Sequence, residues 1–258
     1  MKGARVRRVP VAEETRRGSR HGGGRAKQAG KESIAMFRNL SGWLAGLQRD
    51  PLGTVIEIVF MIAALVLSLM LHEIGHGFVA LKCGDPTAKR MGRLSLDPRR
   101  HLDPIGTICM FFLGIGWARP VPVNPWNLRN RRRDMILVSF AGIFVNLILF
   151  LVTSFLYALS WQWRGQVVDY LQMFLVDMIS FNISLAIFNL VPVPPLDGFR
   201  LVNEIFFRGE LNLSPQTMQI IHFGFLFVCL SGILSTAFSR VCNFCLQNVL
   251  RFFMDLLY

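Results

Sequence analysis

The chain has 258 residues, of which 52% are apolar and only 17% are charged, and its formal net charge is +12. This composition is far more apolar than that of an average soluble domain and indicates membrane spans. The positive charge does not indicate nucleic acid, because most Lys and Arg residues lie in residues 1–49 and 82–133, as membrane topology would explain. Anionic lipids are therefore the expected partner of this charge, with no nucleic acid.

The N-terminal segment is rich in Arg, Gly, Lys and Glu and has almost no large apolar residue, so residues 1–33 are expected to be a disordered basic tail. The apolar core of a signal peptide does not follow these charges before residue 55, and Met36 is an alternative start. Residues 34–53 have apolar residues at helical spacing and are predicted to form an amphipathic segment on the membrane surface.

A core of residues 54–205 is predicted to follow. Its first full span, residues 55–81, is long enough to cross the hydrocarbon of a bilayer. The apolar run 105–118 is too short to cross unaided, so we expect it to be re-entrant or half-buried. Prolines exclude a continuing helix in residues 119–134, which are expected to form a loop or a short extended edge.

The second half of the core contains two further spans, residues 135–161 and about 168–191. A short turn near Arg164 joins them, so they are predicted to be antiparallel neighbours. Prolines in residues 192–200 then break the helix in or near the membrane.

The remainder, residues 206–258, is expected to hold C-terminal membrane helices: a span at 218–238 and an apolar helix at 241–258 that lies along the interface. The predicted fold class is therefore an all-α membrane protein. It is a multi-pass helical bundle of about 4 to 6 membrane segments, with a short irregular, β-edge or re-entrant element between the first two long spans.

Three titratable side chains, His72, Glu73 and His76, lie within the first span, where polar groups are costly and need a reason. Positions i and i+4 share one helical face, so both imidazoles can point at one ion while Glu73 reaches a water on that ion. This is the arrangement of a zinc hydrolase, in which the ion activates water and the carboxylate takes the proton. The alternative is a chance match, or a hydrogen-bonded histidine pair, which an otherwise uncharged span disfavours.

A catalytic zinc usually takes three protein ligands, so one more must come from elsewhere in the chain. Asp197 is the best candidate, because it follows the prolines that unwind the backbone and can therefore be aimed inward. The alternative is an interfacial turn with this carboxylate in solvent. Asp97, Asp103 and Asp177 compete for the role, but none combines membrane depth with a broken helix.

Several motifs follow one another along the chain: HEIGH at 72–76, GRLSLDP at 92–98, DPIGT at 103–107, PVPVNP at 120–125, AGIFVN at 141–146 and NLVPVPPLDG at 189–198. In this order they resemble the site-2 protease family of intramembrane zinc metalloproteases, in its compact prokaryote-type form without an inserted PDZ domain. The resemblance covers roughly residues 37–205.

The resemblance implies a residue set: His72, His76 and Asp197 bind one Zn²⁺ ion, Glu73 is the general base, and Asn146 lies near the substrate or the transition state. The edge near Asn124 is expected to help Asn146 hold an unwound substrate, since a helix hides its carbonyls from attack.

The sequence thus predicts a zinc-dependent metalloendopeptidase that cuts within or beside a transmembrane segment of another membrane protein. The rivals are a membrane zinc carrier, in which Glu73 would be a ligand, and an inactive homologue that acts as a binding module. The expected location is the prokaryotic cell (inner) membrane. A crossing by residues 55–81 puts the basic tail and residues 82–133 on opposite sides of the membrane, although positive charge favours the cytoplasmic side for both. We expect residues 82–133, with the zinc site, at the cytoplasmic face.

Overall fold

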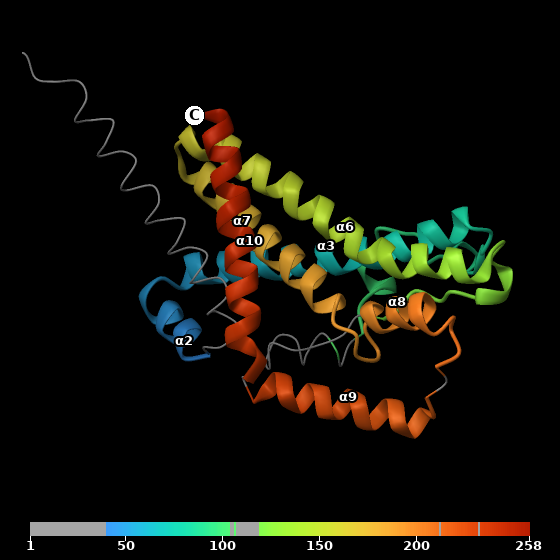
Figure 1. Ribbon diagram of the computed structural model, residues 1–258. Coiled ribbons are helices and arrows are strands. Elements are labelled where there is room, and N and C mark those ends of the chain that lie inside the picture. Colours follow the sequence, from blue (N-terminus) through green and yellow to red (C-terminus); the bar gives the residue numbers. More distant parts are fainter. Residues whose placement is uncertain (1–39, 104–105, 107–118, 212, 232) are drawn as a thin grey trace, which may run out of the picture.

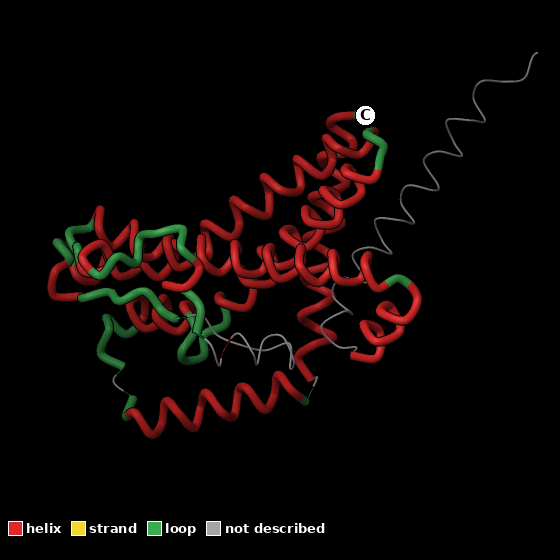
Figure 2. Tube along the Cα trace, turned by 180° about the vertical axis from the view of Figure 1, so that it is seen from behind, coloured by secondary structure: helices red, strands yellow, loops and turns green. Residues whose placement is uncertain are grey.

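The computed structural model describes residues 40–103, 106, 119–211, 213–231 and 233–258. Throughout this part of the chain the regular structure is helical, without a sheet (Figure 2). The expected tail 1–33 lies outside the described residues, and so does the expected re-entrant segment 105–118, except for Gly106. The predicted helical fold is therefore confirmed for the described residues.

Three of the described helices are long and apolar enough to cross a membrane: α3 (Pro51–Lys82), α6 (Arg131–Leu159, continued by the 3-10 turn η3, Ser160–Gln162) and α7 (Gln166–Asn189). They pack side by side and form the centre of the molecule (Figure 1). Each corresponds to one of the three long spans predicted for the core, with ends displaced by a few residues. The protein is therefore built around a bundle of membrane-length helices.

The starts of these helices follow from local sequence. The side chain of Asp50 accepts a hydrogen bond from Gly53 N at 3.0 Å, and Pro51 occupies the first helical position of α3, where no backbone N–H is needed. At the start of α6, Asn130 Oδ1 accepts from Arg133 N at 3.2 Å. Both caps satisfy N–H groups that a helix leaves unpaired at its N-terminus.

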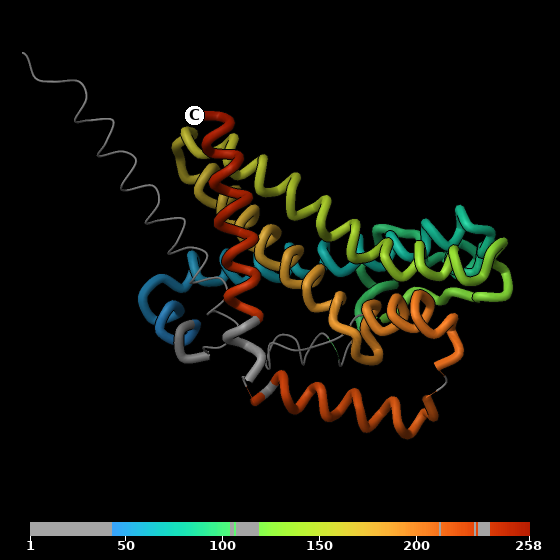
Figure 3. Tube along the Cα trace, viewed as in Figure 1, coloured from blue at the N-terminus to red at the C-terminus, as the bar shows by residue number. Residues whose placement is uncertain are grey.

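Further helices lie around the bundle: α2 (Leu40–Arg49), α4 (Thr87–Arg90), α8 (Asp197–Phe206), α9 (Pro215–Leu230) and α10 (Ile233–Leu257), with 3-10 turns η1 (Pro98–Arg100) and η2 (Pro125–Asn127). Helix α2 packs on α3, α8 packs on α6, and α10 packs on α6 and α7. Figure 3 shows α9, in orange, running along the bottom of the molecule before the chain turns into α10, in red.

The C-terminal helices differ from the prediction. The predicted bounds of the span at 218–238 and of the separate helix at 241–258 are wrong, because α9 ends at Leu230 and α10 begins at Ile233. At the end of α9, Ser231 Oγ donates to Val228 O at 2.8 Å, a side-chain bond that competes with continued helix. Apolar composition alone did not reveal this break.

Buried side chains join the helices in two places that matter for the site. Phe150, Leu175 and Ile179 belong to a cluster shared by α6, α7 and α10, and Ile143 and Ala186 to one shared by α6, α7 and α8. Lipid is as apolar as these side chains, so close packing stabilises their association more than transfer from water does. The second cluster fixes α8, which carries Asp197, against the bundle.

The loop that follows α3 is organised around the fully buried carboxylate of Asp85. It accepts hydrogen bonds from Asn124 N at 2.7 Å, Asn127 Nδ2 at 2.9 Å and Thr87 N at 3.0 Å. Burial alone would raise the pKa of this carboxyl, but the hydrogen bonds to its ionised form hold the pKa below the usual value. Asp85 therefore ties the loop before α6 to the end of α3.

Replacing Asp85 by Ala removes a buried acceptor from several part-buried donors, so we expect the free energy of unfolding at pH 7 to fall by about 2 kcal/mol. The folded pKa is the lower one, so the stabilisation is complete above the unfolded pKa of about 3.9 and is lost as the pH falls through the folded pKa. Thermal unfolding in detergent at pH 7 and on the acid side tests both points. The difference in unfolding temperature between Asp85→Ala and wild type should become smaller in acid. Asp255→Ala is the control, because it removes an exposed surface ion pair, and it should change the unfolding temperature little.

Candidate metal centre

His72 and His76 lie one turn apart on α3, as their spacing predicts, and both are buried. Their Nε2 atoms are 3.0 Å apart. His76 Nδ1 is 2.7 Å from the backbone oxygen of Val138 on α6, and because a carbonyl only accepts, Nδ1 carries the proton. This bond orients the ring and leaves Nε2 of His76 with its lone pair free for a metal.

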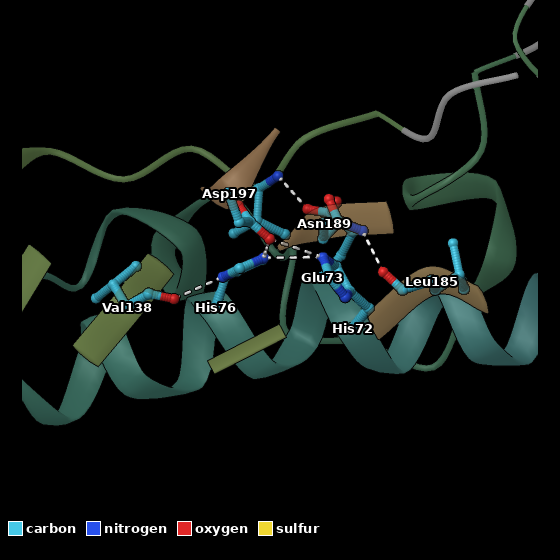
Figure 4. A network of polar contacts seen from close by, with 8 residues as sticks. His72, Glu73, His76, Val138, Leu185, Asn189 and Asp197 are labelled. Carbon is cyan, nitrogen blue, oxygen red and sulfur yellow. Dashed lines mark hydrogen bonds and ion pairs between the residues drawn. The ribbon is translucent and has the colours of Figure 1, made fainter. Parts of the chain in front are cut away.

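Asp197 brings its carboxylate to this pair from the first turn of α8 (Figure 4). Its Oδ2 atom lies 3.2 Å from His72 Nε2 and 3.0 Å from His76 Nε2, and the residue is buried. Helix α7 ends at Asn189, and the proline-rich segment after it stays out of regular helix until α8 begins. The predicted interruption of the helix is confirmed, and it delivers the carboxylate to the histidines.

The three atoms suit a single zinc ion. Two ligands of a tetrahedral zinc, each 2.0–2.1 Å from it, lie about 3.3 Å apart, close to the separations found here. Apart from the two imidazoles, Asp197 Oδ2 has no hydrogen-bond partner among the described residues. Such buried atoms are costly unless they face a bound group. Within the described chain, this is the group of His, Cys, Asp or Glu side chains that could hold a metal ion.

Glu73 lies next to His72 on α3, and one of its carboxylate oxygens is held by backbone. Val121 N donates to Glu73 Oε2 at 2.8 Å. Val121 lies in the described segment just before η2, which has no regular structure, so part of the predicted irregular element contacts Glu73 directly. The bond restricts the carboxylate to one orientation beside the histidines.

Gly142 on α6 is required by the close approach of that helix to the histidines. A Cβ atom at this position would lie 2.6 Å from His72 Nε2 and would also overlap His76 Nε2. In the sequence, Gly142 lies in the motif AGIFVN, and no role was predicted for it. Its position one turn before Asn146 was the available signal, because a glycine inside a helix often marks close packing.

Asn146 is fully buried on the same face of α6 as Gly142, and neither its Oδ1 nor its Nδ2 has a hydrogen-bond partner among the described residues. Asn124 has a different environment: its Oδ1 accepts from Trp126 N at 3.1 Å and caps η2. Asn146 thus lies one turn after Gly142, whose face of α6 approaches the histidines, whereas the side chain of Asn124 makes a local capping contact.

The competing carboxylates have other contacts. Asp97 Oδ1 accepts from Arg99 N at 3.1 Å at the start of η1, and Asp103 Oδ1 accepts from Gly106 N at 2.8 Å. Asp177 is buried within α7. Of the four aspartates considered, Asp197 is the one that meets the histidine pair.

Asn189, at the end of α7, belongs to the same network of polar contacts (Figure 4). Its Nδ2 donates to Leu185 O at 3.0 Å. In the sequence, Asn189 lies in the motif NLVPVPPLDG near the end of the span predicted at about 168–191, and no role was predicted for it.

Membrane-length helices around a buried His-His-Asp group define a helical membrane protein with a candidate zinc centre. A family model described as Peptidase family M50 matches residues 161–232. The chain is 39% identical over 171 residues to "Putative zinc metalloprotease YwhC" of Bacillus subtilis, a match that covers 65% of this chain and 77% of the relative. It is 32% identical over 190 residues to "Putative zinc metalloprotease Rip2" of Mycobacterium tuberculosis, covering 69% of this chain and 66% of the relative.

No solved structure matches the chain significantly. The chain belongs to peptidase family M50, the site-2 protease family, and is a zinc metalloprotease of that family.

A Gly142→Ala substitution tests the packing of α6 on the centre. The added Cβ would displace both imidazoles, so we expect the zinc affinity to fall about tenfold to a hundredfold. Zinc retention against a graded series of chelator concentrations measures this. Gly224→Ala on α9 is the matched control, because a Cβ there meets nothing within 4 Å. Equal zinc retention by the two variants would contradict the geometry described for Gly142.

Proposed function

We propose that the protein is a zinc-dependent intramembrane endopeptidase that hydrolyses a peptide bond within or beside a transmembrane segment of another membrane protein. One observation carries the proposal: the buried group of His72, His76 and Asp197 has both histidines on α3, a helix long enough to cross a bilayer. His76 precedes Lys82, the last residue of α3, by about 9 Å along the helix axis. A centre at this depth suits a substrate that itself lies in the membrane.

In this proposal His72, His76 and Asp197 hold one Zn²⁺ ion, and Glu73 is the general base. When bound, zinc lowers the pKa of its water and polarises the scissile carbonyl. Glu73 accepts the proton from the attacking water and later returns it to the leaving amine. The hydrogen bond from Val121 N supports this role, because a base must be held within reach of the proton it removes.

Asn146 is proposed to bind the substrate carbonyl or the negative charge that develops on it. A buried amide without a partner is costly, and an amide N–H aimed at a developing oxyanion stabilises the transition state. The loop at Asn124 is proposed to hold the unwound substrate through backbone groups. Its attachment to Asp85 supports a fixed, preorganised edge.

We place the centre near the cytoplasmic face of a prokaryotic cell (inner) membrane. Cationic residues gather where α3 ends and α6 begins: Lys82, Lys89, Arg90, Arg131, Arg132 and Arg133. Positive charge favours the cytoplasmic side, and these residues also suit anionic lipid headgroups. The exposed Ile220, Phe223 and Phe227 of α9 suit lipid contact, so we propose that α9 also lies in the membrane beside the three long helices.

The first test separates a protease from a zinc carrier. Glu73→Gln is expected to lower the cleavage rate by about 10² to 10⁴ while zinc binding persists, because the base is lost and the ligands remain. His72→Ala is expected to lose both zinc binding and cleavage. Zinc content of the purified proteins is measured together with cleavage of a membrane protein that accumulates uncut in cells carrying Glu73→Gln.

A carrier would instead lose zinc affinity in the Glu73→Gln variant, with no cleavage to lose. A wild-type protein that binds zinc but leaves every membrane protein uncut would favour the inactive homologue. Full cleavage by His72→Ala would exclude the proposed centre.

The second test concerns Asn146. Asn146→Leu is expected to lower the rate about 10²- to 10³-fold with zinc retained, since a donor to the transition state is removed. Asn248→Leu, at an exposed position of α10, is the matched control and should leave the rate unchanged. An Asn146→Leu enzyme with the wild-type rate would remove this residue from the proposal.

A further inference from the structure

Arg93 is a buried cation in the loop after α4, and its guanidinium binds backbone in place of a carboxylate. Its Nη2 donates to the carbonyl oxygens of Arg119 and, at 3.2 Å, of Pro120. Arg119 is held from its other side as well, because its N–H donates to His101 O at 2.8 Å. The chain segment just before Val121 is therefore clamped between two parts of the same loop.

The carbonyl of Pro120 and the N–H of Val121 belong to one peptide group. Such a group is planar and rigid, and in the trans form its oxygen and its N–H point in opposite directions. Here the oxygen accepts from Arg93 and the N–H donates to Glu73 Oε2 at 2.8 Å. One rigid peptide unit thus connects the guanidinium of Arg93 to the carboxylate of Glu73.

We infer that Arg93 is a positioning residue for Glu73, which it acts on through the Pro120–Val121 peptide group. The inference rests on the proposed role of Glu73 as the general base. The guanidinium fixes where the peptide lies and polarises it, so that the N–H becomes a stronger donor to the carboxylate.

The packing of α3 against this loop supports the assignment. Gly77 lies one turn after Glu73, and a Cβ there would lie 2.7 Å from Leu94 Cδ2 and 3.0 Å from Val121 Cγ1. Helix α3 therefore approaches both the residue that follows Arg93 and the residue that binds Glu73. Residues 73 and 77 share one face of α3, so this face packs on both Val121 and the neighbour of Arg93.

The charges agree with the geometry. Burial lowers the pKa of the Arg93 guanidinium, and the negative charge of Glu73 opposes that lowering. Arg93 stays protonated in a protein, so it supplies a permanent positive charge behind the peptide group. A lysine at this position would carry the same charge but could not present the planar fork of donors.

The experiment uses as substrate the membrane protein that accumulates uncut in cells carrying Glu73→Gln. For its cleavage, kcat and KM per zinc-loaded enzyme are measured for Arg93→Met, Arg93→Gln and Arg93→Lys. We expect kcat of the Met and Gln variants to fall about tenfold to a hundredfold, with KM within about threefold of wild type and zinc retained. Arg93→Lys should recover part of the loss. Arg99→Met, at an exposed arginine of the same loop, is the matched control and should keep the wild-type kcat.

A zinc-loaded Arg93→Met enzyme with the wild-type kcat would overturn the inference, and the Gln variant decides the same question if the Met variant does not fold. A purely structural role predicts less folded protein but an unchanged kcat per zinc-loaded molecule, which would also overturn it. Glu73→Gln separates the two levels: if that variant still cleaves, the proposed base itself is wrong, whereas an inactive Glu73→Gln beside a fully active Arg93→Met refutes the positioning role alone.

Discussion

The structure depends on the meeting of three ligand atoms inside an apolar bundle: Nε2 of His72, Nε2 of His76 and Oδ2 of Asp197. Unpaired polar atoms are expensive at membrane depth, so each must be matched by a neighbour or by a bound ion. Much of the local architecture follows from this requirement. Helix α6 must come close enough to contact the imidazoles, which Gly142 permits, and α7 must stop so that α8 can supply the carboxylate.

Backbone groups orient the side chains of the centre. The carbonyl of Val138 holds His76, and the N–H of Val121 holds Glu73. Backbone positions are set by the fold, so these contacts are less mobile than contacts between long side chains would be. The segment that supplies Val121 must therefore be held in place itself. Buried Asp85 and Arg93 do this by hydrogen bonds to its backbone. The geometry of the candidate centre is in this way supported by polar residues next to it.

The long helices and the residues of the centre were predictable from sequence, because each leaves a local signal. Uninterrupted apolar runs predicted α3, α6 and α7, and the four-residue spacing of His72 and His76 predicted a shared face. Asp197 was predictable because prolines forbid helix just before it. The division between α9 and α10 was predicted too late in the chain, since both helices are apolar and hydropathy does not register a one-residue cap such as Ser231.

The contacts of Gly142, Arg93 and Val121 also could not be read from the sequence. They depend on how closely two segments approach in space, and Val121 contributes a backbone atom that every residue except proline possesses. Periodicity predicts which face a side chain occupies. It does not predict the distance between that face and a loop more than forty residues away.

The position of Asp197 has a consequence for how the protein is made. The histidines lie on the first described membrane-length helix, and the carboxylate that completes their group begins a helix that follows two more such helices. Ribosomes deliver the chain from its N-terminus, so the histidines enter the membrane long before their partner is synthesised. The centre can close only after most of the bundle has been inserted. A nascent chain therefore carries the two histidines without the carboxylate that completes the candidate metal centre.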